Sequence, residues 1–259
     1  MKIDIISMWY NESFLVPFFL KHYSWADTIH LLIDEETTDS TLEIVQKFDN
    51  VEVIPVRFPD MLDDLLKVKK INNLYRSLDS DWVIAVDSDE FVFPLPLNRD
   101  IRDVLQQESK YNLLYAQMWQ VYRHRCDSDL DPNLPAILQR RHGDPDVSSS
   151  INASYVKPIV VRSSLDIEWA PGCHVIWKSK IGQIWDVIRG KQILPSPHCI
   201  YGAHWAMADP ELGVLRRIQR KERISKRNLE LELGSRNFYI TEEQIREECS
   251  RHLDDPILF

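Results

Sequence analysis

Short apolar runs alternate with amphipathic segments along the first third of the chain. Apolar runs bounded by turn residues are typical of buried strands, whereas apolar residues three and four positions apart are typical of helices. The pattern predicts strands at residues 3–8, 28–33, 51–56 and 82–86, and helices at residues 12–23, 40–48 and 61–78. Ser40 to Glu43 fit a capping box at the start of the second helix. This alternation predicts an α/β fold with a doubly wound, mostly parallel sheet and right-handed crossovers.

The pattern changes beyond Pro94. The segments predicted there are a helix at 101–108, an aromatic-rich strand at 113–123, a polar loop at 127–150, strands at 155–162 and 174–178, a strand that reaches His204, a basic helix at 210–231 and a capped helix at 241–252. We find no internal repeat and no separate second domain in the sequence. We therefore expect one domain with two halves, at residues 1–95 and 96–259.

Composition and charge narrow the class of protein. At 259 residues, with 44% hydrophobic and 27% charged residues, the chain can bury a sizeable core. Its net charge of −9 gives no indication of nucleic-acid binding, and an acidic chain needs a local metal ion or basic patch to bind a phosphate. We see no signal peptide, no apolar run long enough to cross a bilayer, and 4 scattered cysteines, so we expect reduced thiols in a cytoplasmic protein.

The most informative segment is the apolar run from Trp82 to Val86, which ends in Asp87-Ser88-Asp89. Ligands of open α/β sheets bind beyond the carboxyl ends of the strands. Two carboxylates at i and i+2 repel each other unless a cation lies between them. Oxygen ligands of this kind suit Mg²⁺ or Mn²⁺, with substrate phosphates completing the coordination. The segment therefore indicates a divalent metal bound to a phosphorylated substrate.

Three other interpretations of Asp-Ser-Asp compete with a site for Mg²⁺ or Mn²⁺ and a phosphate. Aspartate and serine also form turns. A phosphatase-type Asp-x-Asp normally follows the first strand and has Thr or Val two residues later, where this chain has Phe91. A Ca²⁺-binding loop would need Asp-x-Asp-x-Asp-Gly, which is absent, and the 7 glycines form no Gly-x-Gly-x-x-Gly or Walker loop.

Other polar residues should converge on the same edge. Tyr10-Asn11-Glu12 follow the first strand, Asp34 ends the second, and Lys69 lies on the helix that leads into the fourth. Together the pattern resembles the family 2 glycosyltransferases and their relatives with the GT-A fold, which is Rossmann-like. The elements that match run in order over about residues 1–95: Ile5 to Glu12 as the opening strand and Asn-Glu turn, Leu32 to Asp34 with Thr37 to Thr41, and Ile84 to Phe91 as the Asp-x-Asp strand.

This resemblance implies a role for each matching residue. Asp89 would bind the divalent metal, Mn²⁺ or Mg²⁺, and Asp87 would bind it through water or contact the ribose. Asp34 would contact the base. Tyr10, Asn11, Glu12, Ser88 and Lys69 would contribute to the nucleotide-sugar site. The metal would neutralise the leaving nucleoside diphosphate. Residues 1–95 would then bind the donor, and residues 96–259 would bind the acceptor and complete the metal site.

The second half resembles a bacterial subgroup of GT-A enzymes with a late histidine before a basic helix. It lacks the usual Glu-Asp pair before a helix, and instead has Pro171 to His174 and Gly202 to Trp205. The resemblance implies that His204 completes the metal site. An inverting transfer needs a base, for which His174, Asp186 and Glu168 are candidates by position, whereas a retaining transfer needs none. The arginines and lysines from Arg216 to Arg227 form a solvated face by default, or contact the diphosphate or an anionic membrane.

These observations lead to one expected function and two alternatives. We expect a metal-dependent glycosyltransferase of polysaccharide synthesis that moves a sugar from a nucleoside diphosphate sugar to a glycan or lipid-linked acceptor, at the inner face of the membrane. The aromatic segment Trp119 to Tyr122 and the loop 127–150 would shape the acceptor site. The alternatives are a nucleotidyltransferase acting on sugar phosphates, although its usual Gly-rich loop is absent, and a non-catalytic nucleotide- or glycan-binding module.

Overall fold

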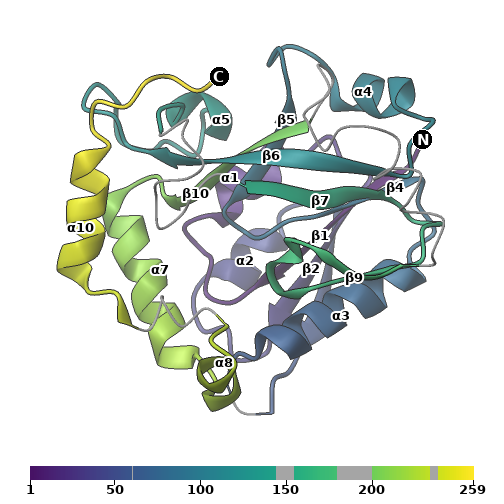
Figure 1. The fold of residues 1–259 in the computed structure, drawn as a ribbon, viewed down its shortest axis with the longest axis horizontal. Coiled ribbons are helices and arrows are strands. Elements are labelled where there is room, and N and C mark those ends of the chain that lie inside the picture. The colour runs from purple at the N-terminus through teal and green to yellow at the C-terminus, as the bar shows by residue number, and fades with distance from the viewer. Residues whose placement is uncertain (60, 144–154, 180–199, 234–238) are drawn as a thin grey trace.

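The structure is a computed structural model that describes residues 1–59, 61–143, 155–179, 200–233 and 239–259. Its strands form an eight-stranded sheet in the order β3-β2-β1-β4-β7-β6-β10-β5 and a two-stranded sheet, β8-β9 (Figure 1). The strands are β1 (Ile3–Trp9), β2 (Thr28–Asp34), β3 (Val51–Val56), β4 (Trp82–Ala85), β5 (Glu90–Pro94), β6 (Leu113–Tyr122), β7 (Tyr155–Arg162), β8 (Ile167–Trp169), β9 (Ile176–Ser179) and β10 (Ile200–Met207). The helices are α1 (Val16–His22), α2 (Thr41–Val45), α3 (Asp64–Ser77), α4 (Ile101–Gln107), α5 (Ala136–Gln139), the 3₁₀ turn η1 (Pro171–Cys173), α7 (Pro210–Arg223), α8 (Lys226–Glu230) and α10 (Glu242–Arg251).

The first half of the sheet confirms the doubly wound α/β fold predicted from the sequence. β3, β2, β1 and β4 are parallel neighbours. The chain moves outward from β1 to β3 and then returns, so that β4 pairs with the other side of β1. Right-handed crossovers therefore place α1 and α2 on one face of the sheet and α3 on the other. The order reverses between β1 and β4, and such switch points are where open α/β sheets bind ligands.

The second half of the sheet is mixed. β7 is antiparallel to both β4 and β6, β10 is parallel to β6, and β5 is antiparallel to β10 at the edge. The register of the last pair places His204 opposite Glu90. The late histidine of the sequence is thereby brought next to the Asp-x-Asp segment, although more than one hundred positions separate them in the chain.

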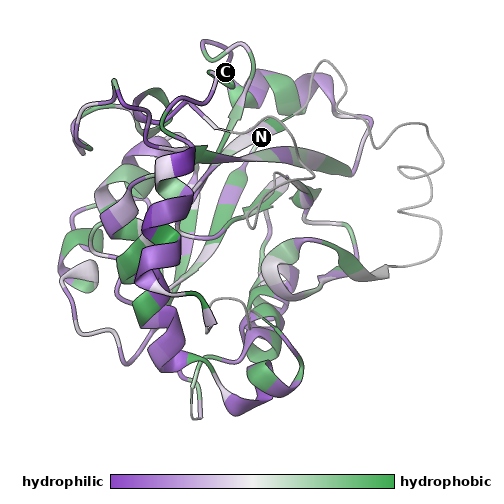
Figure 2. Cartoon of the chain, turned by 60° about the vertical axis from the view of Figure 1, so that its left-hand side comes forward, coloured by the Kyte–Doolittle hydropathy of each residue, from purple (hydrophilic) through white to green (hydrophobic). Residues whose placement is uncertain are grey.

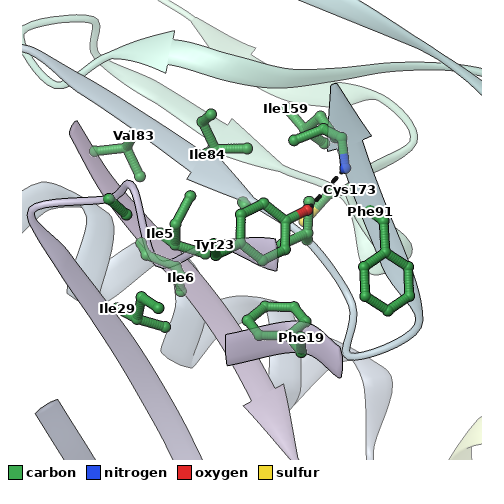
Figure 3. Close-up of a cluster of buried hydrophobic side chains, with 14 of the residues drawn as sticks. Ile5, Ile6, Phe19, Tyr23, Ile29, Val83, Ile84, Phe91, Ile159 and Cys173 are labelled. Atoms are coloured by element: carbon green, nitrogen blue, oxygen red, sulfur yellow. Dashed lines mark hydrogen bonds between the residues drawn. The ribbon is translucent and has the colours of Figure 1, made fainter. Parts of the chain in front are cut away.

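The core between α1 and the sheet holds the start of β5 in place. The Phe19 ring lies 5.0 Å from that of Trp9 and 4.5 Å from that of Tyr23, and Figure 3 shows Phe19 and Tyr23 grouped with Ile5 and Phe91. Burying each such side chain stabilises the fold by about 1.5–3 kcal/mol. The Tyr23 hydroxyl also donates a hydrogen bond to the Glu90 carbonyl, at 2.8 Å, which fixes the backbone directly after Asp89.

Helices α7 and α10 lie side by side next to the ends of β6 and β10 (Figure 1). They share a small apolar cluster, whose members are Tyr122, Met207, Val214, Ile245 and Cys249. Gly213 permits the close approach, because a Cβ atom there would lie 3.2 Å from Ile245 and from Met207. Figure 2, in which the left-hand side of Figure 1 comes forward, shows hydrophilic residues along these helices. As predicted, α10 is capped: Thr241 and Gln244 form a capping box.

Three predicted helices differ from the structure for local reasons. The helix expected from residue 12 begins at Val16, because residues 12–15 form a turn closed by hydrogen bonds from the Leu15 and Val16 amides to the Glu12 carbonyl. The capping box predicted at Ser40 is wrong: its side chain makes no cap, and the Asp39 carboxylate instead accepts from the Thr41 amide. The helix predicted at 210–231 is broken at residue 224, whose extended backbone (φ −68°, ψ 127°) pairs with residue 62.

The strands β5 and β8 and the short helical elements α5 and η1 were not predicted from the sequence. β5 follows the Asp-x-Asp turn directly, in a segment for which no element was predicted, and β8 is only three residues long. α5 lies within the segment predicted as a loop, of which residues 144–150 are outside the described part. Among the residues described, we find no helix with the length and apolar character needed to cross a membrane.

Candidate functional site

The polar residues that follow β1, β2 and β4 meet at one edge of the sheet, as the sequence predicted. β1 and β4 are adjacent and parallel, so Glu12 and Ser88 come together, and the Ser88 hydroxyl donates to Glu12 Oε1 at 2.7 Å. Ser88 and Asp89 are both buried. We call this group of side chains at the strand ends the carboxylate edge; it consists of Glu12, Asp34, Asp87, Ser88 and Asp89.

Asp87 is paired with a lysine of α3. Lys67 Nζ lies 2.7 Å from Asp87 Oδ1. Burial would raise the pKa of Asp87, but the cations of Lys67 and Lys157 outweigh it and hold this pKa well below its usual range. Asp87 therefore stays ionised at any physiological pH. The Lys69 side chain, which the sequence analysis assigned to this edge, is exposed. Residues 67 and 69 differ by two positions and so point in nearly opposite directions on a helix.

Asp89 is in contact with an arginine and a histidine. Arg216 Nη2 lies 3.1 Å and His204 Nε2 lies 3.4 Å from Asp89 Oδ2. The Asp89 side chain is only 6% exposed, and the Arg216 and His204 contacts overcome the effect of burial and hold the pKa of Asp89 well below its usual range. The Asp89 carbonyl also accepts from the Trp205 amide at 2.7 Å. The structure thus places His204 where a shared ligand of Asp89 and His204 could bind.

Glu12 completes the group around Arg216. Arg216 Nη1 donates to Glu12 Oε2 at 2.5 Å and to the Ser88 hydroxyl at 3.3 Å. Burial raises the pKa of Glu12 above its usual value, although Arg216 and Ser88 act in the opposite direction. One guanidinium therefore joins the ends of β1 and β4.

Asp34 and Tyr10 are joined by a second arginine of α7. Arg223 Nη2 donates to Asp34 Oδ2 at 2.7 Å, and its guanidinium carbon lies 3.6 Å from the centre of the Tyr10 ring. Arg223 and Asp34 are both buried. The predicted contact of Asp34 with a nucleobase stays a prediction; in this structure an arginine and a tyrosine ring are stacked beside that carboxylate.

Asn11 has a role in positioning the loops. It has a positive φ of 49°, which asparagine tolerates better than most residues. Its Oδ1 accepts hydrogen bonds from the amides of Thr38 (2.8 Å) and Asp39 (3.3 Å). The Asp39 carboxylate in turn accepts from the Ser13 amide. These bonds hold the loops after β1 and β2 together, which orients Tyr10 and Glu12 at the edge.

The default interpretation treated the basic residues 216–227 as a solvated face. The structure instead shows many of them in contact with carboxylates. Four arginines of α7 and α8, spaced by four, three and four residues, each contact at least one carboxylate: Arg216 with Glu12 and Asp89, Arg220 with Asp64, Arg223 with Asp34 and Glu36, and Arg227 with Asp63. The spacing puts Arg216, Arg220 and Arg223 on one side of α7, whereas Arg227 lies on α8, beyond the break at residue 224. The spacing of the arginines can be read from the sequence, but the carboxylates that they contact cannot.

A buried ion pair lies directly behind the carboxylate edge. Lys157 Nζ lies 2.7 and 2.9 Å from the two carboxylate oxygens of Glu90, and both side chains are 1% exposed. Glu90 Oε2 also accepts from the Asp87 amide, at 3.1 Å. The pair therefore supports the Asp-x-Asp turn from behind. The pair was not predicted from the sequence, because Glu90 and Lys157 are 67 positions apart and no local pattern marks either one as buried.

The three candidate bases, His174, Glu168 and Asp186, differ in their surroundings. His174 follows η1, and its ring covers Gly172, where a Cβ atom would lie 2.7 Å from His174 Nε2. Partial desolvation and the charge of Lys157 lower the pKa of His174 to about 4, so its imidazole is neutral at pH 7 but is a weaker base than an ordinary histidine. Glu168 contacts Arg76, at 2.6 Å, on the surface beside α3. Asp186 lies outside the described residues.

The aromatic segment predicted to shape an acceptor site is divided. Trp119 is half-buried and stacks on Tyr201, with ring centres 4.9 Å apart. Tyr122 is fully buried and stacks on His252, at 3.8 Å. Tyr122 is therefore part of the packing against α10 and cannot offer a ring face to an acceptor, whereas Trp119 retains some exposure.

The carboxylate edge offers few ligands for a metal ion. Within the described part of the chain, no group of three or more His, Cys, Asp or Glu side chains could hold one. Asp89 and His204 offer two donors, and Mg²⁺ commonly takes only one or two protein carboxylates when substrate phosphates supply the rest. The two donors fit an ion of this kind, but Arg216 is already in contact with the same oxygen of Asp89.

Comparison with known proteins gives limited similarity. No protein-family model and no curated protein sequence matches the chain. Three solved structures show distant likeness. S. aureus TarS has 12% identity over 97% of this chain and 43% of its own, with a TM-score of 0.41. Glucosyl-3-phosphoglycerate synthase from Mycobacterium tuberculosis, in complex with Mn²⁺, uridine diphosphate and phosphoglyceric acid, has 15% identity over 93% and 80%, with a TM-score of 0.38.

The third structure is CMP:2-keto-3-deoxy-manno-octonic acid synthetase complexed with CTP. It has 13% identity over 63% of this chain and 75% of its own, with a TM-score of 0.32. The present chain spans less than half of the length of the TarS chain. Because all three TM-scores are below 0.5, we draw no functional argument from them; the α/β fold class rests on the sheet order described above.

Proposed function

We propose that this protein is a glycosyltransferase that transfers a sugar from a nucleoside diphosphate sugar. The observation that carries the proposal is the convergence of Glu12, Asp87 and Asp89 at the β1–β4 switch point, with basic side chains from α3 and α7 in contact with them. Ionised carboxylates at a strand end can bind a divalent counter-ion, and nearby cationic side chains can contact the phosphates of a ligand.

The proposal assigns the nucleoside to the β1–β2 side of the edge. Asp34 and Tyr10 lie there, next to Arg223. A carboxylate can accept hydrogen bonds from a base or a ribose, and an aromatic or guanidinium face can stack on a base. On this arrangement the diphosphate extends toward Ser88 and Asp89, where Arg216 supplies positive charge.

The metal-dependent form of the proposal uses Asp89 and His204. Bound there with the donor's phosphates, Mn²⁺ or Mg²⁺ would neutralise the leaving nucleoside diphosphate. Asp87 would contact the ion through water or contact the ribose, and Lys67 keeps it ionised and oriented. We propose His174 as the group that takes a proton from an acceptor hydroxyl, because its imidazole is neutral and lies near Asp87 and His204; the nearby charge of Lys157 makes it a weak base until a ligand changes that field. We propose a glycan or lipid-linked acceptor.

A donor screen tests the proposal directly. Nucleoside diphosphate sugars are compared by thermal unfolding with and without Mn²⁺. A donor present at 100 times its dissociation constant stabilises by about 2.7 kcal/mol, which raises the melting temperature by about 5–10 °C for a chain of this size. The Asp89→Asn variant should lose this shift. The matched control is Asp79→Asn, the same change at an exposed position before β4, which should keep it.

Product analysis then separates the alternatives. A glycosyltransferase releases a nucleoside diphosphate and forms a glycoside, or releases free sugar when water is the acceptor. Release of pyrophosphate from a nucleoside triphosphate and a sugar phosphate would instead identify a nucleotidyltransferase. Binding of a sugar nucleotide with no product of either kind would identify a non-catalytic module. If no sugar nucleotide shifts the melting temperature, the proposal is wrong.

A further inference from the structure

We propose that Arg216 is the built-in counter-ion of Asp89 and that it competes with a divalent cation for this carboxylate. The inference deepens the proposed function, since it concerns the same site, and it makes a claim that a simple metal site does not. On this view the chain holds its own cation at the carboxylate edge, and metal binding requires that cation to leave Asp89.

The geometry of Arg216 supports this role. Its two terminal nitrogens contact carboxylates that follow different strands: Nη2 lies 3.1 Å from Asp89 Oδ2, after β4, and Nη1 lies 2.5 Å from Glu12 Oε2, after β1. The Arg216 side chain is 21% exposed and that of Asp89 only 6%, so water screens this contact weakly. A guanidinium whose two terminal nitrogens each contact a carboxylate has a fixed orientation, and it stays charged at any physiological pH.

The competition follows from the atom that the groups share. Arg216 and His204 both approach Oδ2 of Asp89, at 3.1 and 3.4 Å. An ion bound by Asp89 and His204 would sit about 2 Å from each ligand atom. It would then lie next to the guanidinium, and two positive charges at such a distance with little intervening water repel each other. The two cations therefore cannot both be seated fully at Asp89.

Arg216 can withdraw without the rest of α7 moving. The helix is anchored separately by Arg220 on Asp64, at 2.8 Å, and by Arg223 on Asp34, at 2.7 Å. The backbone after α7 is also tied down, because the Leu62 amide donates to the Arg223 carbonyl and the Ser225 amide donates to the Leu62 carbonyl. A change of side-chain rotamer therefore suffices to carry the guanidinium away from Asp89, toward the phosphates of a bound donor.

The consequence is weak binding of metal alone. In the absence of a diphosphate, a divalent ion has to displace Arg216 from its contact with Asp89. Removing the guanidinium should therefore strengthen metal binding. One neighbouring opposite charge changes the proton affinity of a carboxylate by about ten-fold or more, and we expect an effect of about ten-fold on the affinity for Mn²⁺.

The experiment measures Mn²⁺ binding by the electron paramagnetic resonance signal of free Mn²⁺, with no nucleotide present. Arg216→Gln should lower the dissociation constant for Mn²⁺ by about ten-fold relative to the wild-type chain. Lys226→Gln removes the same charge from an exposed position on α8 and should leave the constant unchanged. Arg216→Lys keeps the charge and the helix propensity but loses the fork, so it should strengthen binding by less; it serves as the test if the glutamine variant does not fold.

The outcomes separate this inference from the proposed function. Mn²⁺ affinity that is unchanged, weaker or undetectable in folded Arg216 variants overturns the competition. If the wild-type chain nevertheless turns over a sugar nucleotide, the proposed function stands without it. If no sugar nucleotide binds, the proposed function fails, whatever the Mn²⁺ measurements give.

Discussion

The buried pair of Glu90 and Lys157 offers the sharpest test of the energetics of this fold. Lys157 reaches both carboxylate oxygens of Glu90 within 2.9 Å, and each side chain is 1% exposed. The charges of Glu90 and Asp87 outweigh burial and raise the pKa of Lys157 above its ordinary value, so Lys157 is charged at neutral pH. Lys157→Met removes the cation that neutralises Glu90 and leaves the apolar volume nearly unchanged.

The expected loss is large. Removing one partner of a buried ion pair costs about 3–5 kcal/mol, because the remaining charge lies in a medium that solvates it poorly. For a chain of this length, that corresponds to a fall in melting temperature of about 6–20 °C. Urea unfolding followed by circular dichroism measures the free energy directly. The control is Lys47→Met, which breaks the exposed i,i+4 pair with Glu43 and should cost less than about 1 kcal/mol.

A double-mutant cycle identifies the cause. Glu90→Gln combined with Lys157→Met removes both charges and keeps an oxygen that can accept from the Asp87 amide. The double variant should regain most of the lost stability, since a neutral pair does not carry the cost of a buried charge. If the two losses simply add, the single-variant effect comes from altered packing, and the electrostatic reasoning is refuted.

Three further predictions concern the carboxylate edge. Asp89→Asn should abolish sugar transfer while circular dichroism shows an intact fold; wild-type activity at saturating Mn²⁺ would contradict the metal assignment. Asp34→Asn should raise the donor KM with kcat little changed, and the reverse pattern in steady-state kinetics would remove Asp34 from the nucleotide site. His204→Ala should weaken Mn²⁺ binding in calorimetry by about ten-fold or more, whereas His174→Ala should lower only kcat; equal Mn²⁺ affinity in His204→Ala would count against its role as a ligand.

The first half of the fold could be predicted because its signals are local. The β1 strand is buried along its whole length, and a strand buried on both faces has a largely apolar sequence, which Asp4 and Ser7 interrupt here. Its alternation with helices then restricts the topology to parallel crossovers. The positions of Glu12, Asp34 and Asp89 at the strand ends followed from that topology, since parallel neighbours end at one edge.

The pairing of charges could not be predicted in the same way. Lys67 and Lys69 are equally plausible in the sequence, and only the rotation of α3 about its axis decides which one reaches Asp87. Arg216 contacts Glu12 across more than two hundred positions of sequence, so no local pattern connects them. β5 was missed because its pairing partner, β10, comes much later in the chain.

The balance of charge at the carboxylate edge bears on whether the arginines of α7 could replace a metal ion. Among the described residues, Asp89 contacts Arg216 and His204, Asp87 contacts Lys67, and Asp34 contacts Arg223. These basic side chains are already engaged by carboxylates, and a diphosphate would add further negative charge. The arginines neutralise the edge in the absence of a ligand but provide no surplus for the ligand itself. A divalent ion at Asp89 would supply that surplus and would at the same time release Arg216 toward the phosphates. On this reasoning the basic helix and the metal are not alternatives: the helix keeps the edge folded without a donor, and the metal makes its charge available when a donor binds.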